Sequence, residues 1–381
     1  MRKLYFIVSI LTLLIYSCED NISSFQSNNF IKFFGGGNGS YGSSCVEIPG
    51  EGFIFTGYDI TTSGNKQVYA AKTDLYGNVV WENTFISDDS IQEGQQIKHL
   101  DDGNSIIVGS SKISASATSS PFMLKIDSYG DLIWKKNFIV NYNLLVNDIA
   151  ITTNNIFLVG ESYRYSASLP DTYIAKYNLD GTIVDTVTKG NVLKFETFKK
   201  IFTKSNGDII VVGNSNLSGS ASLVTISEYG GSLSTPKFYK ELDAEKTRDV
   251  KDAIYADNCF YLLIYEDNVC TKVLKRSSDY PYPQIWETES ISNFKGKSIT
   301  LSQNGELFIV GEYGNQIQFV EVDSQGAAYY GAEVFLTYPG SVGKIINTVD
   351  NGLLVVGSTT SAYNSMVQLI KTGSDLYLLK P

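Results

Sequence analysis

Apolar residues in this chain fall into short runs that end in glycine and return at nearly regular intervals. There are seven such runs, of which six end in glycine and one degenerate run, Tyr261–Tyr265, ends in tyrosine. The copies lie about 46 to 53 residues apart, and segments this short and rich in Val, Ile and Phe are typical of β-strands. The six regular runs are Phe53–Gly57, Ile106–Gly109, Ile156–Gly160, Ile209–Gly213, Leu307–Gly311 and Leu353–Gly357.

Each run belongs to a unit of four predicted strands. An apolar run and a turn with Asp or Asn beside Gly precede it, as in Leu100–Gly103, and a third and a fourth strand follow. No window has the period of an amphipathic helix of ten or more residues. Seven units predict an all-β fold, a seven-bladed β-propeller of four-stranded antiparallel blades spanning residues 30–381. Two packed sandwiches are the alternative, and the unbroken repeat disfavours them.

Two segments compete for the strand that closes the ring. Phe30–Phe34 resembles the end of a fourth strand such as Trp81–Phe85, so it is able to complete the last blade. Asp375–Leu379 has the composition for the same place. The sequence does not decide between them.

The turn between third and fourth strands has the spelling Asp-x-x-Gly-x-x-x-Trp in two units, Asp74–Trp81 and Asp127–Trp134. Other units keep a turn-forming residue and Gly but replace Trp, for example by Asp185. Asp, Asn or Ser at the first position and Gly at the fourth are typical of a type I β-turn. We therefore interpret the motif as a structural turn, after which a large ring covers the seam between neighbouring blades.

These units resemble the repeats of PQQ-like and delta-60-type propeller families, in which an Asp-bearing turn followed by Trp links the third and fourth strands. Trp286 lies near the equivalent place in the fifth unit. The spelling is one residue shorter than the PQQ-type version, and the residues that would bind the quinone are not found. The resemblance implies a fold and no chemistry.

The N-terminus has the three parts of an export signal, which we assign to residues 1–17. Arg2 and Lys3 precede an apolar run from Leu4 to Ile15, too short to span a bilayer. Ile15–Cys18 resembles a bacterial lipobox, which implies that Cys18 carries a lipid such as palmitate; an ordinary secretory signal is the alternative. Residues 18–29 then form a tether. Acidic residues directly after Cys18 resemble the surface-export signal of Bacteroidota-type lipoproteins, so we expect an outer-membrane lipoprotein exposed at the cell surface.

Net charge and cysteine content exclude two further features, nucleic-acid binding and a disulfide framework. Without Arg2 and Lys3 the chain has 28 basic and 40 acidic side chains, a net charge near −12, which repels nucleic-acid backbones. The remaining cysteines, Cys45, Cys259 and Cys270, are odd in number and out of register across one hairpin, so we expect buried thiols and no disulfide framework. His99 is the sole histidine and is interpreted as a strand residue.

One face of the predicted ring carries longer loops than the other. These loops join second to third strands and are rich in Ser, Tyr and Asn, which are adaptable recognition residues. We expect binding there, although plain solvated loops remain the alternative. The segments are Tyr58–Lys66, Ser110–Pro121, Glu161–Asp171, Asn214–Ala221 and Ser358–Ser365.

The residue after each repeat Gly is expected near the channel mouth on this face. Three glutamates and a tyrosine there are suited to a sugar or a bound cation such as calcium, or they merely solubilise the rim. Tyr165 lies close by in sequence. The candidate ligands are Tyr58, Glu161, Tyr163, Arg164, Glu266, Glu312 and Tyr313, and the other rim positions are Ser110, Asn214 and Ser358.

Three functions fit these observations. The favoured one is non-catalytic binding of a glycan or an envelope protein partner, with no cofactor. A carbohydrate-active enzyme that uses channel-mouth glutamates is the second, because a glycosidase needs two carboxylates at a defined separation. A structural or assembly component of the outer membrane is the third. A serine triad is disfavoured because no G-x-S-x-G motif occurs.

Overall fold

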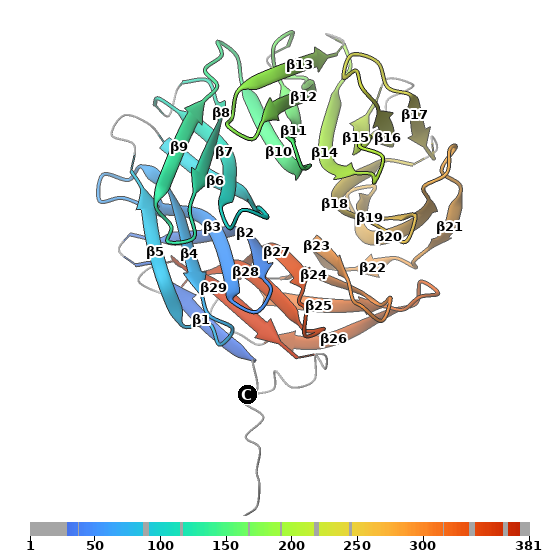
Figure 1. Cartoon of the computed structure of the whole chain (residues 1–381). Coiled ribbons are helices and arrows are strands. Elements are labelled where there is room, and N and C mark those ends of the chain that lie inside the picture. The colour runs from blue at the N-terminus through green and yellow to red at the C-terminus, as the bar shows by residue number, and fades with distance from the viewer. Residues whose placement is uncertain are drawn as a thin grey trace, which may run out of the picture.

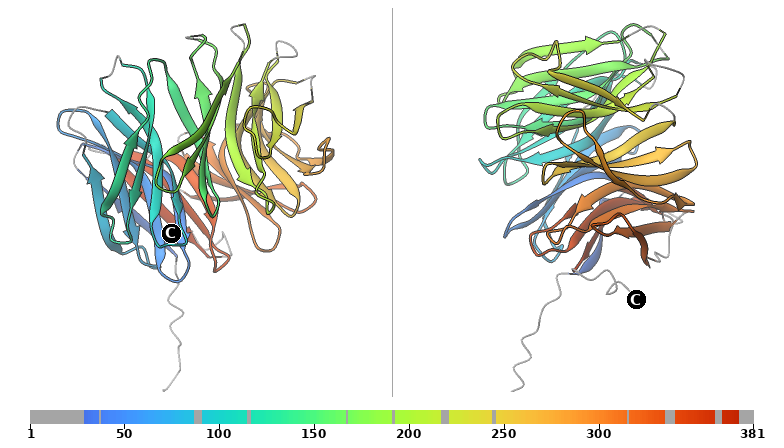
Figure 2. Two further views of the ribbon diagram at one scale, coloured as in Figure 1. Left: turned by 45° about the horizontal axis from the view of Figure 1, so that its top comes forward. Right: turned by 90° about the vertical axis from the view of Figure 1, so that its right-hand side faces the viewer.

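Seven four-stranded antiparallel sheets stand around a central axis in the computed structural model, which confirms the predicted seven-bladed β-propeller (Figure 1). Seen from the side, the blades are twisted sheets with loops at both ends (Figure 2). The structure describes residues 29–36, 38–86, 91–114, 117–166, 168–190, 193–216, 221–243, 246–314, 316–334, 340–360 and 365–373. Among these residues, no helix has the length and apolarity needed to cross a bilayer.

The first four blades follow the chain order from the inside of the ring to the outside. The first comprises β2 (Ser40–Ile48), β3 (Gly52–Ile60), β4 (Lys66–Thr73) and β5 (Val79–Phe85). The second comprises β6 (Ile91–His99), β7 (Ser105–Lys112), β8 (Ser120–Ile126) and β9 (Leu132–Asn137). The third comprises β10 (Leu144–Ile151), β11 (Asn155–Ser162), β12 (Asp171–Asn178) and β13 (Ile183–Lys189). The fourth comprises β14 (Glu196–Thr203), β15 (Ile209–Ser215), β16 (Leu223–Tyr229) and β17 (Phe238–Leu242).

The last three blades include one extra strand and one strand from the other end of the chain. The fifth comprises β18 (Arg248–Ala256), β19 (Cys259–Glu266), β20 (Cys270–Ser277) and β21 (Gln284–Glu287), with the short β22 (Ile291–Ser292) also on β20. The sixth comprises β23 (Phe294–Leu301), β24 (Leu307–Tyr313), β25 (Gln316–Val322) and β26 (Ala328–Val334). The seventh comprises β27 (Gly340–Asn347), β28 (Leu353–Thr360), β29 (Ser365–Thr372) and β1 (Phe30–Phe34).

The N-terminal strand β1 closes the ring. It pairs antiparallel with β29, and Phe30 lies opposite Lys371 just as Trp81 lies opposite Lys72 in the first blade. Phe30 thus takes the Trp place of the seventh blade. The competing segment Asp375–Leu379 lies outside the described residues.

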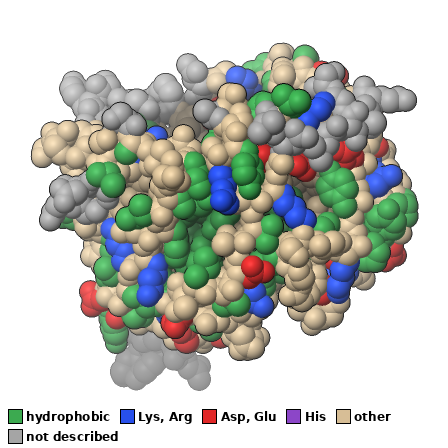
Figure 3. Space-filling model, turned by 90° about the horizontal axis from the view of Figure 1, so that it is seen from above, with side chains coloured by type: hydrophobic (Ala, Val, Ile, Leu, Met, Phe, Trp, Pro, Cys, Tyr) green, Lys and Arg blue, Asp and Glu red, His purple; other side chains and the backbone are tan. Residues whose placement is uncertain are grey.

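The core is divided among the seams between blades. Each of the seven hydrophobic clusters in the described part of the chain joins two neighbouring blades, and together they run round the ring. Second strands such as β15 are buried throughout because a neighbouring blade covers each face. Outermost strands keep exposed apolar residues, including Val79, Leu132 and Ile183. The edge-on view in Figure 3 shows such hydrophobic side chains interspersed with basic ones.

Several of the Asp-x-x-Gly turns contact the neighbouring blade. Asp74 accepts hydrogen bonds from the backbone N–H groups of Tyr76 and Asn78, as a structural turn requires. Trp81 Nε1 reaches across the seam and donates to the carbonyl of Ser128 in the next turn, at 3.0 Å. Trp286 does the same to Ser324, at 3.1 Å. The motif is therefore a scaffold element, and its ring covers the seam as predicted.

The cysteines and the histidine follow their predictions with one exception. Cys45, Cys259 and Cys270 are free thiols, and Glu266, not Cys259, faces Cys270 across the hairpin. Cys45 and Cys270 are buried. The prediction of burial is wrong for Cys259, which is partly exposed because it begins β19 beside a tight turn. His99 ends β6 and contacts the hydroxyl of Ser105.

Candidate functional site

A β-bulge recurs at the same place in every innermost strand. In β14, for example, the register shifts between Phe198 and Lys200, so that one extra residue enters the inner strand. A bulge turns two consecutive side chains toward the same side of a sheet. The paired positions are Ser43–Ser44, Gln95–Gln96, Asn147–Asp148, Lys199–Lys200, Lys251–Asp252, Lys297–Ser298 and Gly343–Lys344.

These bulges line a cavity of about 180 Å³ at the centre of the ring, to which all seven inner strands contribute. None of the described residues that line it has an apolar side chain. Five lysines and one aspartate supply its charge, with amides, hydroxyls and a glycine between them. The lysines are Lys199, Lys200, Lys251, Lys297 and Lys344. A basic chamber thus lies at the centre of an acidic chain.

Two of the lysines have close carboxylate partners. Lys200 Nζ lies 2.7 Å from Asp252 Oδ1, and both side chains are almost fully buried. The other oxygen of Asp252 accepts a hydrogen bond from the Ser298 hydroxyl, at 2.6 Å, and one from the next blade's backbone. Lys199 pairs with Glu161, which comes from β11 of the preceding blade. These pairs tie consecutive blades together.

The other three lysines are less engaged. Lys251 lies 3.8 Å from Asp249 and Lys297 lies 3.7 Å from Glu312, and about 40% of each lysine side chain is exposed. Lys344 has no ion-pair or hydrogen-bond partner within the described ranges. Burial, with Lys98 and Lys200 nearby, lowers its pKa to about 8. Its ammonium group is therefore poorly compensated.

The predicted rim glutamates reach the chamber in two cases. Glu161 accepts hydrogen bonds from Lys199, Asn147 and Tyr163, of which the first two line the cavity. Burial opposes its ionisation, but these partners outweigh burial and lower its pKa. Glu312 contacts the chamber only through Lys297. Both act as partners of the lysines, a role that no pattern in the sequence indicates.

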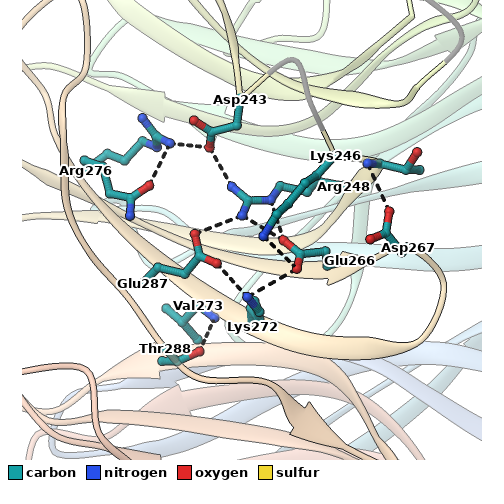
Figure 4. A network of polar contacts seen from close by, with 12 residues as sticks. Asp243, Lys246, Arg248, Glu266, Asp267, Lys272, Val273, Arg276, Glu287 and Thr288 are labelled. Carbon is teal, nitrogen blue, oxygen red and sulfur yellow. Dashed lines mark hydrogen bonds and ion pairs between the residues drawn. The ribbon is translucent and has the colours of Figure 1, made fainter.

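Glu266 belongs to a different structure, an ion network across the fifth blade (Figure 4). Arg248, 3% exposed, contacts Glu266, Glu287 and Asp243, and Lys272 bridges Glu266 and Glu287. Burial disfavours the carboxylate of Glu266, yet Arg248 and Lys272 outweigh it and lower the pKa. The network spans all four strands of this blade, whose β19–β20 turn is short. The structure does not bring Glu266 together with Glu161 and Glu312.

The tyrosines and Arg164 lie around the loop face. Tyr58 stacks on Tyr41, with ring centroids 4.7 Å apart, and Lys66 Nζ lies 4.1 Å from its centroid. Arg164 packs against the rings of Tyr142 and Tyr165. Tyr313 is 43% exposed. Aromatic rings are thus available near the second-to-third loops, which are long in the second, third and fourth blades, where seven or eight residues separate the strands. The prediction of long loops is wrong for the first and seventh blades, where five and four residues separate the strands because β3 and β28 extend past Tyr58 and Ser358.

The remaining rim positions are structural. Ser358 Oγ accepts a hydrogen bond from the backbone N–H of Gly42 across the closing seam. Asn214 bonds the backbone of Arg248 and Val250 in the next blade, and Ser110 contacts Gln95. Where the chain is described, no three His, Cys, Asp or Glu side chains gather closely enough to hold a metal ion.

Comparisons with known proteins agree on shape only. No family model and no curated protein matches the sequence. A streptogramin B lyase structure is 13% identical, with TM-score 0.57, over 90% of this chain and 98% of its own. The propeller domain of the Trilobed protease from Pyrococcus furiosus is 10% identical, with TM-score 0.52, over 92% and 97%. YCF48 bound to D1 peptide is 10% identical, with TM-score 0.54, over 91% and 97%.

A lyase, a protease domain and a peptide-bound protein share this architecture at about one identical residue in ten. A fold shared so widely carries no particular chemistry, because function resides in the site that each chain builds on it. The chain is therefore a seven-bladed β-propeller, similar in fold to these proteins.

Proposed function

We propose that this chain is a non-catalytic binding protein of the bacterial cell envelope and that its loop face binds a glycan. The observation that carries the proposal is the chamber at the centre of the ring, whose described lining is wholly polar. Interfaces with protein partners usually have a buried core of apolar and aromatic side chains. A strongly hydrated, hydroxyl-rich ligand suits a chamber without one.

The surroundings of the chamber support the same proposal. Tyr58, Tyr163 and Tyr313 offer rings and hydroxyls beside the loops, and the inner strands that hold the polar groups are rigid ladders. Side chains fixed on strands and ringed by variable loops are the usual arrangement of a binding face.

Binding fits the electrostatics better than hydrolysis does. A glycosidase needs a carboxylic acid whose pKa is raised so that it can donate a proton. Cationic partners lower the pKa of Glu161 and of Glu266. Both glutamates are therefore held as carboxylates, which suits binding better than proton donation.

The location is proposed from the N-terminal sequence alone. We infer that Cys18 carries a lipid and that the propeller, built from PQQ-like repeats, is displayed on the outer membrane of a Bacteroidota-type bacterium. Incorporation of radioactive palmitate should depend on Cys18. A Cys18→Ala protein that still takes up the label would contradict the anchor.

Binding is tested with the mature chain against a panel of neutral and acidic polysaccharides, by titration calorimetry and by assay of reducing ends. We expect saturable binding to at least one glycan with no release of reducing ends. A variant with Tyr58, Tyr163, Glu161 and Glu312 all changed to Ala should lose it.

Two results would overturn this proposal. Accumulation of reducing ends, abolished by Glu161→Gln or Glu312→Gln, would establish a hydrolase. Failure to bind any glycan, together with co-purification of an envelope protein, would favour an assembly role.

A further inference from the structure

Three consecutive blades place a lysine at the same bulge position. Lys199, Lys251 and Lys297 occupy it in the fourth, fifth and sixth blades, and Lys344 follows the bulge of the seventh. All four side chains line the central chamber. Ring closure therefore gathers lysines that are up to 145 residues apart in the sequence.

The charges around the chamber leave one positive charge uncompensated. Four of the five lining lysines contact a carboxylate, namely Glu161, Asp252, Asp249 or Glu312. Lys98 and Asp148, which interact electrostatically with Lys344, offset each other in this count. The remaining lysine is Lys344. Because one positive charge is left over, one group with a single negative charge would neutralise the chamber.

We propose that the central chamber binds the monoanionic group of an acidic sugar, a uronate carboxylate or a sulfate ester, with Lys251, Lys297 and Lys344 as its ligands. The proposal rests on the proposed glycan binding and specifies its substrate class. Lys251 and Lys297 are suited to this role because their carboxylate partners lie 3.7–3.8 Å away and are easily exchanged.

Size and charge define the ligand group. A cavity of about 180 Å³ is smaller than the about 300–1,000 Å³ of pockets that enclose whole small ligands. It therefore takes one projecting group while the rest of the chain lies on the loop face. A phosphate monoester carries about −1.5 to −2 at neutral pH, which exceeds the single charge available. No arginine, the side chain that grips phosphate bidentately, lines the described chamber.

The net negative charge of the chain does not prevent this binding. Solvent-exposed charges more than about 8 Å apart are largely screened at physiological ionic strength. The lysines act within the chamber at much shorter range. The acidic surface instead disfavours polyanions that do not reach the chamber.

The experiment compares three probes on the mature chain: oligogalacturonate, its fully methyl-esterified form and dextran sulfate. Esterification removes the charge and keeps the sugar backbone. Binding of oligogalacturonate with at least about tenfold weaker binding of the ester is expected. Preference for dextran sulfate would identify the sulfate ester as the source of the anion.

Variants assign the binding to the chamber. Lys251→Met with Lys297→Met should weaken binding of the acidic probe at least about tenfold, and Lys297→Arg should retain most of it. Lys136→Met with Lys240→Met is the matched control, since it also removes two positive charges, from exposed positions on the outer strands β9 and β17, and should leave binding unchanged. Thermal unfolding of each variant verifies that the ring is intact.

The outcomes separate the two proposals. Equal binding of the acid and its ester, unaffected by the lysine variants, would overturn the anion site and leave glycan binding standing. Binding of none of the three probes by a chain that binds a neutral polysaccharide would overturn the anion site alone, whereas failure to bind any glycan would overturn both proposals. Loss of binding in the control with Lys136→Met and Lys240→Met as large as in the chamber variant would also refute the chamber as the site.

Discussion

Gly130 shows how one residue holds two blades in register. It has a φ of +84°, and a Cβ at this position would lie 2.7 Å from the ring of Trp81 in the preceding blade. Asn83, two residues after that tryptophan, donates to the carbonyl of Gly130 at 2.8 Å. The glycine is required by its backbone conformation and by the ring above it.

We predict that Gly130→Ala lowers the free energy of unfolding by about 2–4 kcal/mol, the sum of left-handed strain and overpacking. Gly207→Ala is the matched control, because Gly207 has the same φ of +84° and no atom near its Cβ position. It should cost only about 1–2 kcal/mol. Denaturant unfolding measures both, and equal losses would show that the ring of Trp81 exerts no steric constraint.

Lys344 is a residue kept at the expense of stability. Its pKa is lowered from 10.5 to about 8 by burial and by its lysine neighbours. The unfolded chain therefore binds more protons than the folded one between pH 8 and 10.5, so the free energy of unfolding rises with pH across this window. Below pH 8 the charged ammonium destabilises the fold.

Lys344→Met should accordingly raise the free energy of unfolding at pH 7, by about 1–3 kcal/mol, and the gain should shrink as pH approaches 10.5. Lys371→Met provides the contrast, because that buried lysine contacts both oxygens of Asp350 at 3.0 Å and should destabilise on removal. Unfolding curves at pH 7 and pH 10 decide the matter. Destabilisation by Lys344→Met at pH 7 would contradict this account.

At the scale of elements, the closing strand β1 determines whether the ring is complete. Its residues fill the seam between the seventh and first blades, where Phe34 packs on Phe55 with ring centroids 4.9 Å apart. Phe30 covers Gly77 just as Trp81 covers Gly130. Without β1, the row of backbone groups on β29 would be an unpaired edge open to other chains.

Deletion of residues 1–34 should therefore lower the unfolding temperature and promote association, measured by calorimetry and size-exclusion chromatography. Deletion of residues 374–381 should change neither, since β1 already pairs with β29. Phe30→Ala, which retains the backbone ladder, should cost about 1–3 kcal/mol. A reversed order of the two deletions would show that the C-terminal segment closes the ring.

At the scale of the whole molecule, the four-stranded blade and its sevenfold repetition could be predicted from the sequence. The glycine-terminated runs, the Asp-bearing turns and their spacing each reflect contacts within a blade or with the next one, and such contacts leave a period in the sequence. Trp286 was placed correctly for this reason, whereas Phe30–Phe34 was only one of two candidates for the closing strand. The loop bounds were predicted less accurately, because pairing with the neighbouring strand sets where a strand ends: β3 continues to Ile60, which pairs with Lys66, past the predicted loop start at Tyr58.

The side chains at the centre of the ring follow from the folded structure and not from any motif. Lys199, Lys251, Lys297 and Lys344 carry no shared motif, and each is an ordinary basic residue in its own strand. Their one signal is an interval near that of the blades, which is visible only once the bulge position is known. The bulges aim them at the axis, and ring closure brings them together. Local periodicity thus encodes the repeat, whereas the charge of the chamber arises from contacts between distant inner strands.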